Sequence, residues 1–225
     1  MRRRAARDGA QREAAGGIGG HLRDGAEIYR RSFAIIRAEA DLAGLDAALE
    51  RTVVRMIHAC GMVDITGDIA ASPGFAQAAT DALIGGAPIL CDTQMVAAGI
   101  TRSRLPAENE VVCTIGEPDV PELAASLRCT RSAAAVAHWR ERMDGSLCVI
   151  GNAPTALFAL LAMIEQGAPR PAAVIGVPVG FVGAAESKLA LSSHEPGLDH
   201  LVVHGRRGGS AIAAAAVNAL ACERE

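Results

Sequence analysis

Leu147-Cys148-Val149-Ile150 is followed at once by Gly151-Asn152-Ala153-Pro154-Thr155, and this stretch decides the fold class. Four consecutive apolar residues are typical of a short strand that is buried on both faces. The small and turn-forming residues after them lead into an apolar helical pattern over residues 155–164. A buried strand that passes through a tight turn into a helix is the repeating unit of a parallel sheet covered by helices.

The same alternation continues on both sides of this stretch. Four more short apolar runs cover residues 89–91, 111–115, 173–177 and 201–203. Helical patterns lie between and after them, around Met95 and over residues 132–143, 184–191 and 210–221. The sequence therefore predicts an α/β fold, a three-layer α/β/α domain with a mostly parallel, five-stranded, Rossmann-like sheet.

A helical segment precedes this alternation. Asp24 and Asp46 are suitable N-caps for two helices, and Gly61 is placed to end the second in a left-handed conformation. Ile28 and Phe33 belong to an apolar stripe that we expect to face the core. Ser72-Pro73 predicts the start of a third helix, with serine at the N-cap, which ends at Gly85-Gly86.

The first 21 residues differ from the rest. They are rich in arginine and glycine and have no apolar periodicity, so we expect a disordered extension at residues 1–21 and one domain over residues 22–225. A transit peptide is an alternative interpretation, which Asp8 and Glu13 weaken because such peptides are poor in acidic residues. A start codon placed too early is another.

Composition limits the classes of function. The formal net charge is -3 and aromatic residues make up 3% of the 225 residues, which argues against nucleic-acid binding. No apolar run approaches the ~20 residues that cross a bilayer, so we expect no membrane association. The six cysteines show no C-x-x-C spacing, and we interpret them as reduced thiols of a cytoplasmic protein.

Three turns at the carboxyl ends of the expected strands are rich in small residues. They cover residues 151–155, 178–183 and 204–210, and each exposes backbone N–H groups at a helix start, which favours anionic ligands. None has the G-x-G-x-x-G spacing of a dinucleotide site or the lysine of a P-loop. For any single one of these glycines, close packing of a helix on the sheet is the more common explanation.

His58 is the candidate for acid–base chemistry, because histidine exchanges protons near neutral pH. A histidine in the last turn of a helix is more often a core or dipole-stabilised residue, so its position alone does not establish catalysis. Arginines at 55, 102, 131, 206 and 207 suit carboxylates or phosphates, although each is also a normal surface charge. No metal-ligand spacing and no Ser/His/Asp order is present, so the residues alone indicate an anion-binding α/β protein with one candidate histidine.

Several longer segments carry a family resemblance. They are RMIHACG at 55–61, GAPILCD at 86–92, TRSA at 130–133, GNAPTALF at 151–158, PVGFVGAAESK at 178–188 and GRRGGS at 205–210. Through them the chain resembles the precorrin-8X methylmutases of cobalamin biosynthesis, from about residue 23 to residue 221. The resemblance implies an isomerase that converts precorrin-8X to hydrogenobyrinate by migration of a methyl group from C-11 to C-12 of the macrocycle.

The resemblance also implies site residues. It assigns the catalytic role to His58, which as imidazolium protonates or hydrogen-bonds a ring nitrogen of the tetrapyrrole, and it assigns substrate contacts to Ser32, Arg55, Thr101, Arg102 and Arg131. Ile57, Val179 and Phe181 are expected to face the macrocycle. The implied reaction uses no cofactor and no metal, and the family forms homodimers with arginines acting across the interface.

Three alternatives remain open. A cobalt-precorrin-8 methylmutase of the anaerobic pathway shares these motifs, so the sequence does not decide whether the substrate carries cobalt. A corrinoid-binding carrier without turnover predicts that His58 is dispensable. A nucleotide-dependent enzyme on the same sheet requires a glycine-rich turn after the first strand, where Asp92-Thr93-Gln94 stands instead.

Overall fold

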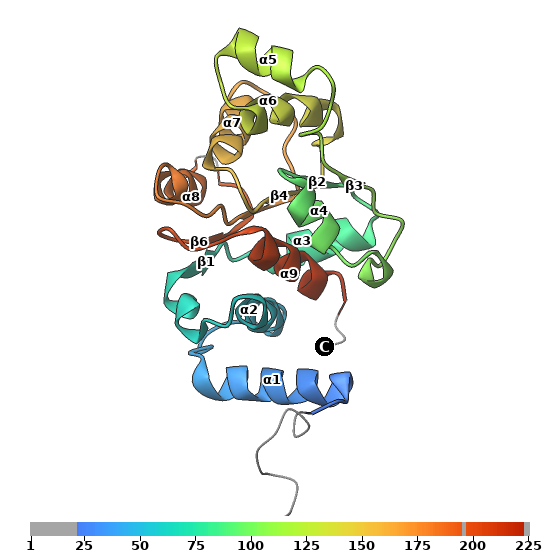
Figure 1. The fold of residues 1–225 in the computed structure, drawn as a ribbon, viewed down its shortest axis with the longest axis vertical. Coiled ribbons are helices and arrows are strands. Elements are labelled where there is room, and N and C mark those ends of the chain that lie inside the picture. The colour runs from blue at the N-terminus through green and yellow to red at the C-terminus, as the bar shows by residue number, and fades with distance from the viewer. Residues whose placement is uncertain (1–21, 195–196, 223–225) are drawn as a thin grey trace, which may run out of the picture.

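The computed structural model describes residues 22–194 and 197–222, so the expected disordered extension lies outside the described residues. A six-stranded sheet crosses the middle of the molecule (Figure 1). Its strand order is β1-β6-β5-β4-β2-β3, with β1 antiparallel to β6 and every other neighbouring pair parallel. The strands are β1 (Ile69–Ala71), β2 (Ile89–Cys91), β3 (Val111–Val112), β4 (Leu147–Ile150), β5 (Ala173–Gly176) and β6 (His200–Val203).

The sheet confirms the predicted α/β class but has six strands rather than five. The additional strand β1 has only three half-buried residues at the edge of the sheet, with Ile69 opposite Val203. Its sequence, Ile69-Ala70-Ala71, contains a single residue that favours strands followed by two alanines, which is why it gives only a weak strand signal. The strand expected over residues 111–115 is also shorter, because β3 ends at Val112.

Two core clusters cover the two faces of the sheet. Leu147 and Val149 of β4 point into one cluster, and Cys148 and Ile150 point into the other, as the period of two in a strand requires. The first cluster is formed with α2 (Ala47–Cys60), α3 (Phe75–Ile84), α4 (Gln94–Gly99) and α9 (Ser210–Leu220). The second is formed with α7 (Pro154–Glu165), α8 (Ala184–Ser192), the end of α6 (Arg131–Val136) and the 3-10 helix η3 (Ala137–Arg142). The three-layer prediction is confirmed.

Two helices lie outside these layers. Helix α1 (Gly25–Glu39) packs on α2 below the sheet, and α5 (Val120–Leu127) packs on α6 at the opposite end (Figure 1). The predicted caps are present, because the carboxylates of Asp24 and Asp46 accept backbone N–H groups at the starts of α1 and α2. Gly61 ends α2 with φ 71°, the left-handed conformation that favours glycine.

Two local predictions are wrong. Helix α3 begins at Phe75 after Gly74, and Ser72 is not its N-cap. The Ser72 hydroxyl instead donates to Asp199 at 2.8 Å and accepts the backbone N–H of His200 at 3.0 Å, which ties edge strand β1 to the start of β6. Ile28 is 42% exposed rather than part of the core.

Of the helices described, none combines the length and apolar composition that a bilayer crossing requires.

Candidate functional site

Ser32 of α1 and His58 of α2 form the central contact of the candidate site. The Ser32 hydroxyl lies 2.8 Å from Nδ1 of His58, although the two residues are 26 positions apart. Tyr29 and Phe33, also on α1, place their rings with centroids 5.0 Å and 5.1 Å from the imidazole. Because Tyr29, Ser32 and Phe33 are spaced i, i+3 and i+4, they share one face of α1 and surround the imidazole from that side.

This group of residues contributes to the walls of two cavities. A cavity of about 770 Å³ is lined by Tyr29 and Phe33, by Thr101 and by arginines 30, 37, 55 and 104. A second cavity of about 460 Å³ contains Ser32 and His58 in its wall, and its other lining is mostly apolar, including Ile28, Ile35, Ile57 and Val63. The imidazole therefore lies between an arginine-rich space and an apolar space.

The electrostatic environment disfavours the charged form of His58. Partial burial of the ring is the main cause that lowers the pKa of His58, and the positive charge of Arg55 adds to it. The guanidinium of Arg55 also lies 5.4 Å from the centroid of the Phe33 ring. A lower pKa makes the imidazolium a stronger acid but reduces its population near neutral pH.

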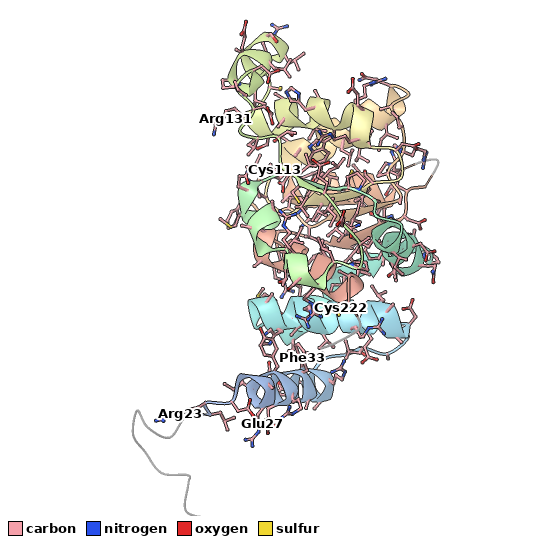
Figure 2. The ribbon with its side chains drawn as sticks, turned by 90° about the vertical axis from the view of Figure 1, so that its right-hand side faces the viewer. Arg23, Glu27, Phe33, Cys113, Arg131 and Cys222 are labelled. Atoms are coloured by element: carbon pink, nitrogen blue, oxygen red, sulfur yellow. The ribbon has the colours of Figure 1, made fainter. Side chains whose placement is uncertain are left out.

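The residues that the resemblance assigned to the substrate are only partly brought together. Ser32 contacts His58, and Arg55 and Thr101 line the larger cavity. Arg102 follows Thr101 at the start of the 3-10 helix η2 (Arg102–Arg104) and is exposed. Arg131 begins α6 and lies far from Phe33 of α1 (Figure 2). Within one chain, Arg131 is thus separated from the α1 side of the site, where Ser32 contacts His58.

The residues that the resemblance places against the macrocycle are also only partly brought together. Ile57 lines the apolar cavity. Val179 and Phe181 lie in the loop after β5, where they are 46% and 84% exposed. The guanidinium of Arg206 lies 5.3 Å from the centroid of the Phe181 ring. These two apolar side chains are therefore part of an exposed loop rather than of the cavity that contains His58.

The prediction that the turn after β4 binds an anionic ligand is wrong, because a side chain of the same protein already uses its N–H groups. The buried carboxylate of Asp92, at the end of β2, accepts the backbone N–H groups of Gly151, Asn152 and Ala153 at 3.0, 2.9 and 2.7 Å. Burial raises the pKa of Asp92, and these three hydrogen bonds oppose that shift. The turn does receive an anion, but the anion is a side chain of the same protein.

Donors of the other two turns are also used internally. The N–H of Gly180 donates to the carbonyl of Arg206, and the N–H of Gly209 donates to that of Val177. Gly208 must be glycine, because a Cβ atom there would lie 2.2 Å from the Val177 carbonyl oxygen. Fully buried Lys188 donates to the Arg207 carbonyl at 2.7 Å, and burial lowers the pKa of Lys188 to about 8.

Sequence reasoning missed Tyr29, Arg30 and Asp92. The helical spacing from Tyr29 to Ser32 and Phe33 is a signal that could have identified the first. Asp92 carries a weaker signal, a lone carboxylate directly after a buried strand, whose partners come 59 to 61 residues later. Among the described residues, no three His, Cys, Asp or Glu side chains gather as metal ligands do.

Comparison with known proteins agrees with this architecture. The precorrin-8X methylmutase family model matches residues 27–223. A precorrin-8X methylmutase from Pseudomonas aeruginosa is 62% identical over 205 residues, which cover 91% of this chain and 99% of that protein. One from Sinorhizobium is 58% identical over 201 residues, covering 89% of this chain and 96% of that one.

A solved structure and a further relative show the same similarity to methylmutases of this pathway. The precorrin-8X methylmutase from Thermus thermophilus superposes with a TM-score of 0.79 at 40% identity and covers 88% of this chain and 95% of its own. A cobalt-precorrin-8 methylmutase from Methanothermobacter thermautotrophicus is 38% identical over 205 residues, covering 90% of this chain and 95% of that protein. The chain, matched by the family model over nearly all of its described residues, belongs to the precorrin-8X methylmutase family.

Proposed function

We propose that this protein isomerises precorrin-8X to hydrogenobyrinate in cobalamin biosynthesis by moving the C-11 methyl group to C-12. The observation that carries the proposal is the Ser32–His58 contact at the boundary between an arginine-lined and an apolar cavity. The substrate has the same two characters, because it is a flat, largely apolar macrocycle with a rim of carboxylates. The arginine-lined cavity suits the carboxylates, and the apolar cavity suits the macrocycle.

His58 is proposed as the proton donor to a ring nitrogen. Ser32 accepts from or donates to Nδ1, so it orients the imidazole and leaves Nε2 as the atom that faces the ligand. The methyl group moves with its electron pair between adjacent carbons of one molecule, so the rearrangement needs no external methyl donor. The proton returns to His58 when the product forms, which leaves the protein unchanged. A general acid of this kind contributes about 10²–10⁴-fold, and correct positioning of the ring supplies the rest.

The metal-free substrate is favoured over its cobalt form. The relatives named for precorrin-8X are 62% and 58% identical to this chain, whereas the relative from Methanothermobacter, which is named for cobalt-precorrin-8, is 38% identical. We therefore expect turnover of precorrin-8X itself. Comparison of kcat/KM for precorrin-8X and for cobalt-precorrin-8 tests this assignment.

We further propose that the enzyme is a cytoplasmic homodimer and that Arg131 acts on the substrate held by the partner subunit. Two observations support the homodimer, and a third supports the location. Arg131 is far from the α1–α2 contact in one chain (Figure 2), and the apolar side chains of Ile28, Tyr29 and Ile35 on α1 are 42%, 46% and 55% exposed. All six cysteines are free thiols, the state that a reducing compartment maintains. Light scattering of the purified protein measures the oligomeric state.

His58→Ala tests the proposed function. We expect kcat to fall by about 10²–10⁴-fold, while the affinity for hydrogenobyrinate stays within a few-fold because the arginines are untouched. His138→Ala is the matched control, since His138 is a histidine of η3 whose Nε2 lies 3.3 Å from the Asp119 carboxylate and which is not part of either cavity wall. Turnover of precorrin-8X is followed by absorbance.

Two results would contradict the proposal. Wild-type turnover by His58→Ala would make His58 a packing residue. Tight binding of hydrogenobyrinate by the wild-type protein without any isomerisation would identify a corrinoid carrier instead of an enzyme.

A further inference from the structure

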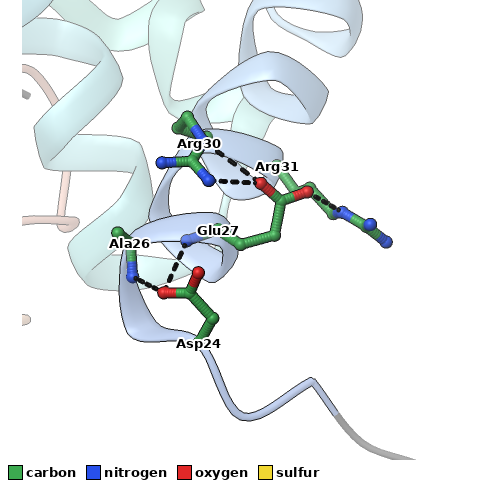
Figure 3. Close-up of polar contacts among 5 residues, drawn as sticks. All are labelled: Asp24, Ala26, Glu27, Arg30 and Arg31. Atoms are coloured by element: carbon green, nitrogen blue, oxygen red, sulfur yellow. Dashed lines mark hydrogen bonds and ion pairs between the residues drawn. The ribbon is translucent and has the colours of Figure 1, made fainter.

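A three-residue cluster on α1 connects the two cavities. One carboxylate oxygen of Glu27 accepts hydrogen bonds from Nε and Nη2 of Arg30, at 3.1 Å and 2.6 Å. The other oxygen accepts a hydrogen bond from Nε of Arg31 at 2.6 Å (Figure 3). Arg30 lines the larger, arginine-rich cavity, whereas Arg31 lines the cavity that contains Ser32 and His58. The Glu27–Arg30–Arg31 cluster thus places one guanidinium in the wall of each cavity.

The cluster has more donors than its own carboxylate uses. Two arginines and one glutamate leave a net charge of +1, and a guanidinium carries five N–H donors. Within the described part of the chain, Nη1 of Arg30 and both Nη atoms of Arg31 make no hydrogen bond. The two arginine side chains are 66% and 60% exposed, while Glu27 is 30% exposed. The guanidinium groups are therefore accessible to a second carboxylate.

The internal ion pairs hold the arginines only weakly. Solvent-exposed pairs of this kind contribute little to stability, because water screens them and the long side chains lose freedom. The hydrogen bonds from Arg31 and then Arg30 lower the pKa of Glu27, so it remains an anion at neutral pH. A ligand carboxylate can consequently replace Glu27 as the partner at small cost.

We propose that Arg30 and Arg31 bind peripheral carboxylates of the tetrapyrrole, one on each side of His58, and that Glu27 is an internal competitor for the same donors. This inference rests on the proposed function and adds two binding residues to it. Glu27 occupies the arginines in the empty site and repels the ligand carboxylates in the filled one. Its role is to keep the ligand, and above all the product, from binding too tightly for release.

The test compares Arg30→Gln, Arg31→Gln and Glu27→Gln with Arg142→Gln. Arg142 is the matched control because it forms a comparable exposed ion pair, with Glu110 at 3.0 Å, outside the walls of both cavities. Each variant is titrated with hydrogenobyrinate by absorbance, and KM and kcat are measured with precorrin-8X. Circular dichroism checks that α1 stays folded.

The expected changes have opposite signs. Arg30→Gln and Arg31→Gln each raise Kd and KM by about tenfold, as expected for one charged hydrogen-bond partner lost, with kcat within about twofold. Glu27→Gln lowers the Kd for hydrogenobyrinate by about threefold, since a competitor is removed. Arg142→Gln leaves all three constants unchanged.

A purely structural role predicts the same sign for all three cluster variants, because each of them breaks at least one of the two ion pairs of Glu27. The inference is overturned if Glu27→Gln weakens binding as the arginine variants do, or if Arg30→Gln and Arg31→Gln bind like Arg142→Gln. Failure of the wild-type protein to bind hydrogenobyrinate at all would contradict the proposed function instead, so the two failures are distinguishable.

Discussion

The α1–α2 region and the carboxyl edge of the sheet meet negative charge in different ways. At the sheet edge, three backbone N–H groups at the start of α7 are filled by the buried carboxylate of Asp92. Between α1 and α2, arginines 30, 37, 55 and 104 line an open cavity of about 770 Å³. A sequence pattern that favours anions therefore identifies hydrogen-bond donors but not the anion that they bind. At the sheet edge that anion is a side chain of the same protein. Between α1 and α2 we propose that it is the substrate.

Asp92→Ala is expected to have the largest effect on stability. Three backbone N–H groups would lose their acceptor, and each buried group left without a partner costs about 1–3 kcal/mol. Since burial raises the pKa of Asp92, relief of a buried charge offsets part of this. We expect the free energy of unfolding at pH 7, measured by urea denaturation, to fall by about 3 kcal/mol or more.

Asp46→Ala is the matched control for Asp92→Ala. Asp46 accepts two backbone N–H groups at a helix start, whereas Asp92 accepts three. Because Asp46 is exposed, its removal should lower the free energy of unfolding by only about 1 kcal/mol. Inorganic phosphate should raise the melting temperature of Asp92→Ala more than that of the wild-type protein, because the vacated turn is then open to an anion. Equal losses for the two variants would show that burial does not distinguish these sites.

Arg131→Ala should weaken hydrogenobyrinate binding by about 1.5–3 kcal/mol, the range for a charged hydrogen bond. Mixing this variant with His58→Ala tests whether the two residues of one site come from two different subunits. If the site uses Arg131 of the partner subunit, random heterodimers contain one intact site, and activity returns to about a quarter of the wild-type value. No recovery after subunit exchange, with binding weakened, would place Arg131 in the same chain's site.

Arg55→Gln should move the pH dependence of turnover. The folded-state pKa of His58 is lowered, so the imidazolium and the activity that needs it are lost as pH rises through a value below the ordinary 6.5. Removing the lesser cause, the Arg55 charge, raises the pKa of His58, and the loss of kcat/KM moves to higher pH. Arg55→Lys keeps the charge and should keep the profile; a shift in both variants would exclude this electrostatic account.

Deletion of residues 1–20 should have the smallest effect. Arginine- and glycine-rich segments without apolar periodicity contribute no core, so the melting temperature and kcat/KM should be unchanged. An inactive or insoluble truncated protein would show that the segment contacts the folded part.

Local patterns account for most of what was predicted correctly. The alternation of inward residues in β4 and the caps at Asp24 and Asp46 depend on neighbours within a few positions, and both are present. The misassigned residues have distant partners. Ser72 bonds Asp199, 127 positions away, and Asp92 bonds the turn after β4. No local pattern contains such a partner, so neither role was visible in the sequence.

The candidate site likewise combines residues that the sequence identified with surroundings that only the packing of helices creates. Family resemblance assigned Ser32 and His58, but the cavities on either side of them depend on how α1 packs against α2, and Ile28, expected in the core, lines one of these cavities instead. By itself, the sequence determined the alternation of strands and helices, the helix caps and the family, because these are written in short spacings and contiguous motifs. The tertiary structure alone decided which donors at the sheet edge are already filled and which arginines line a cavity, because hydrogen bonding and burial depend on groups that folding brings together from distant parts of the chain.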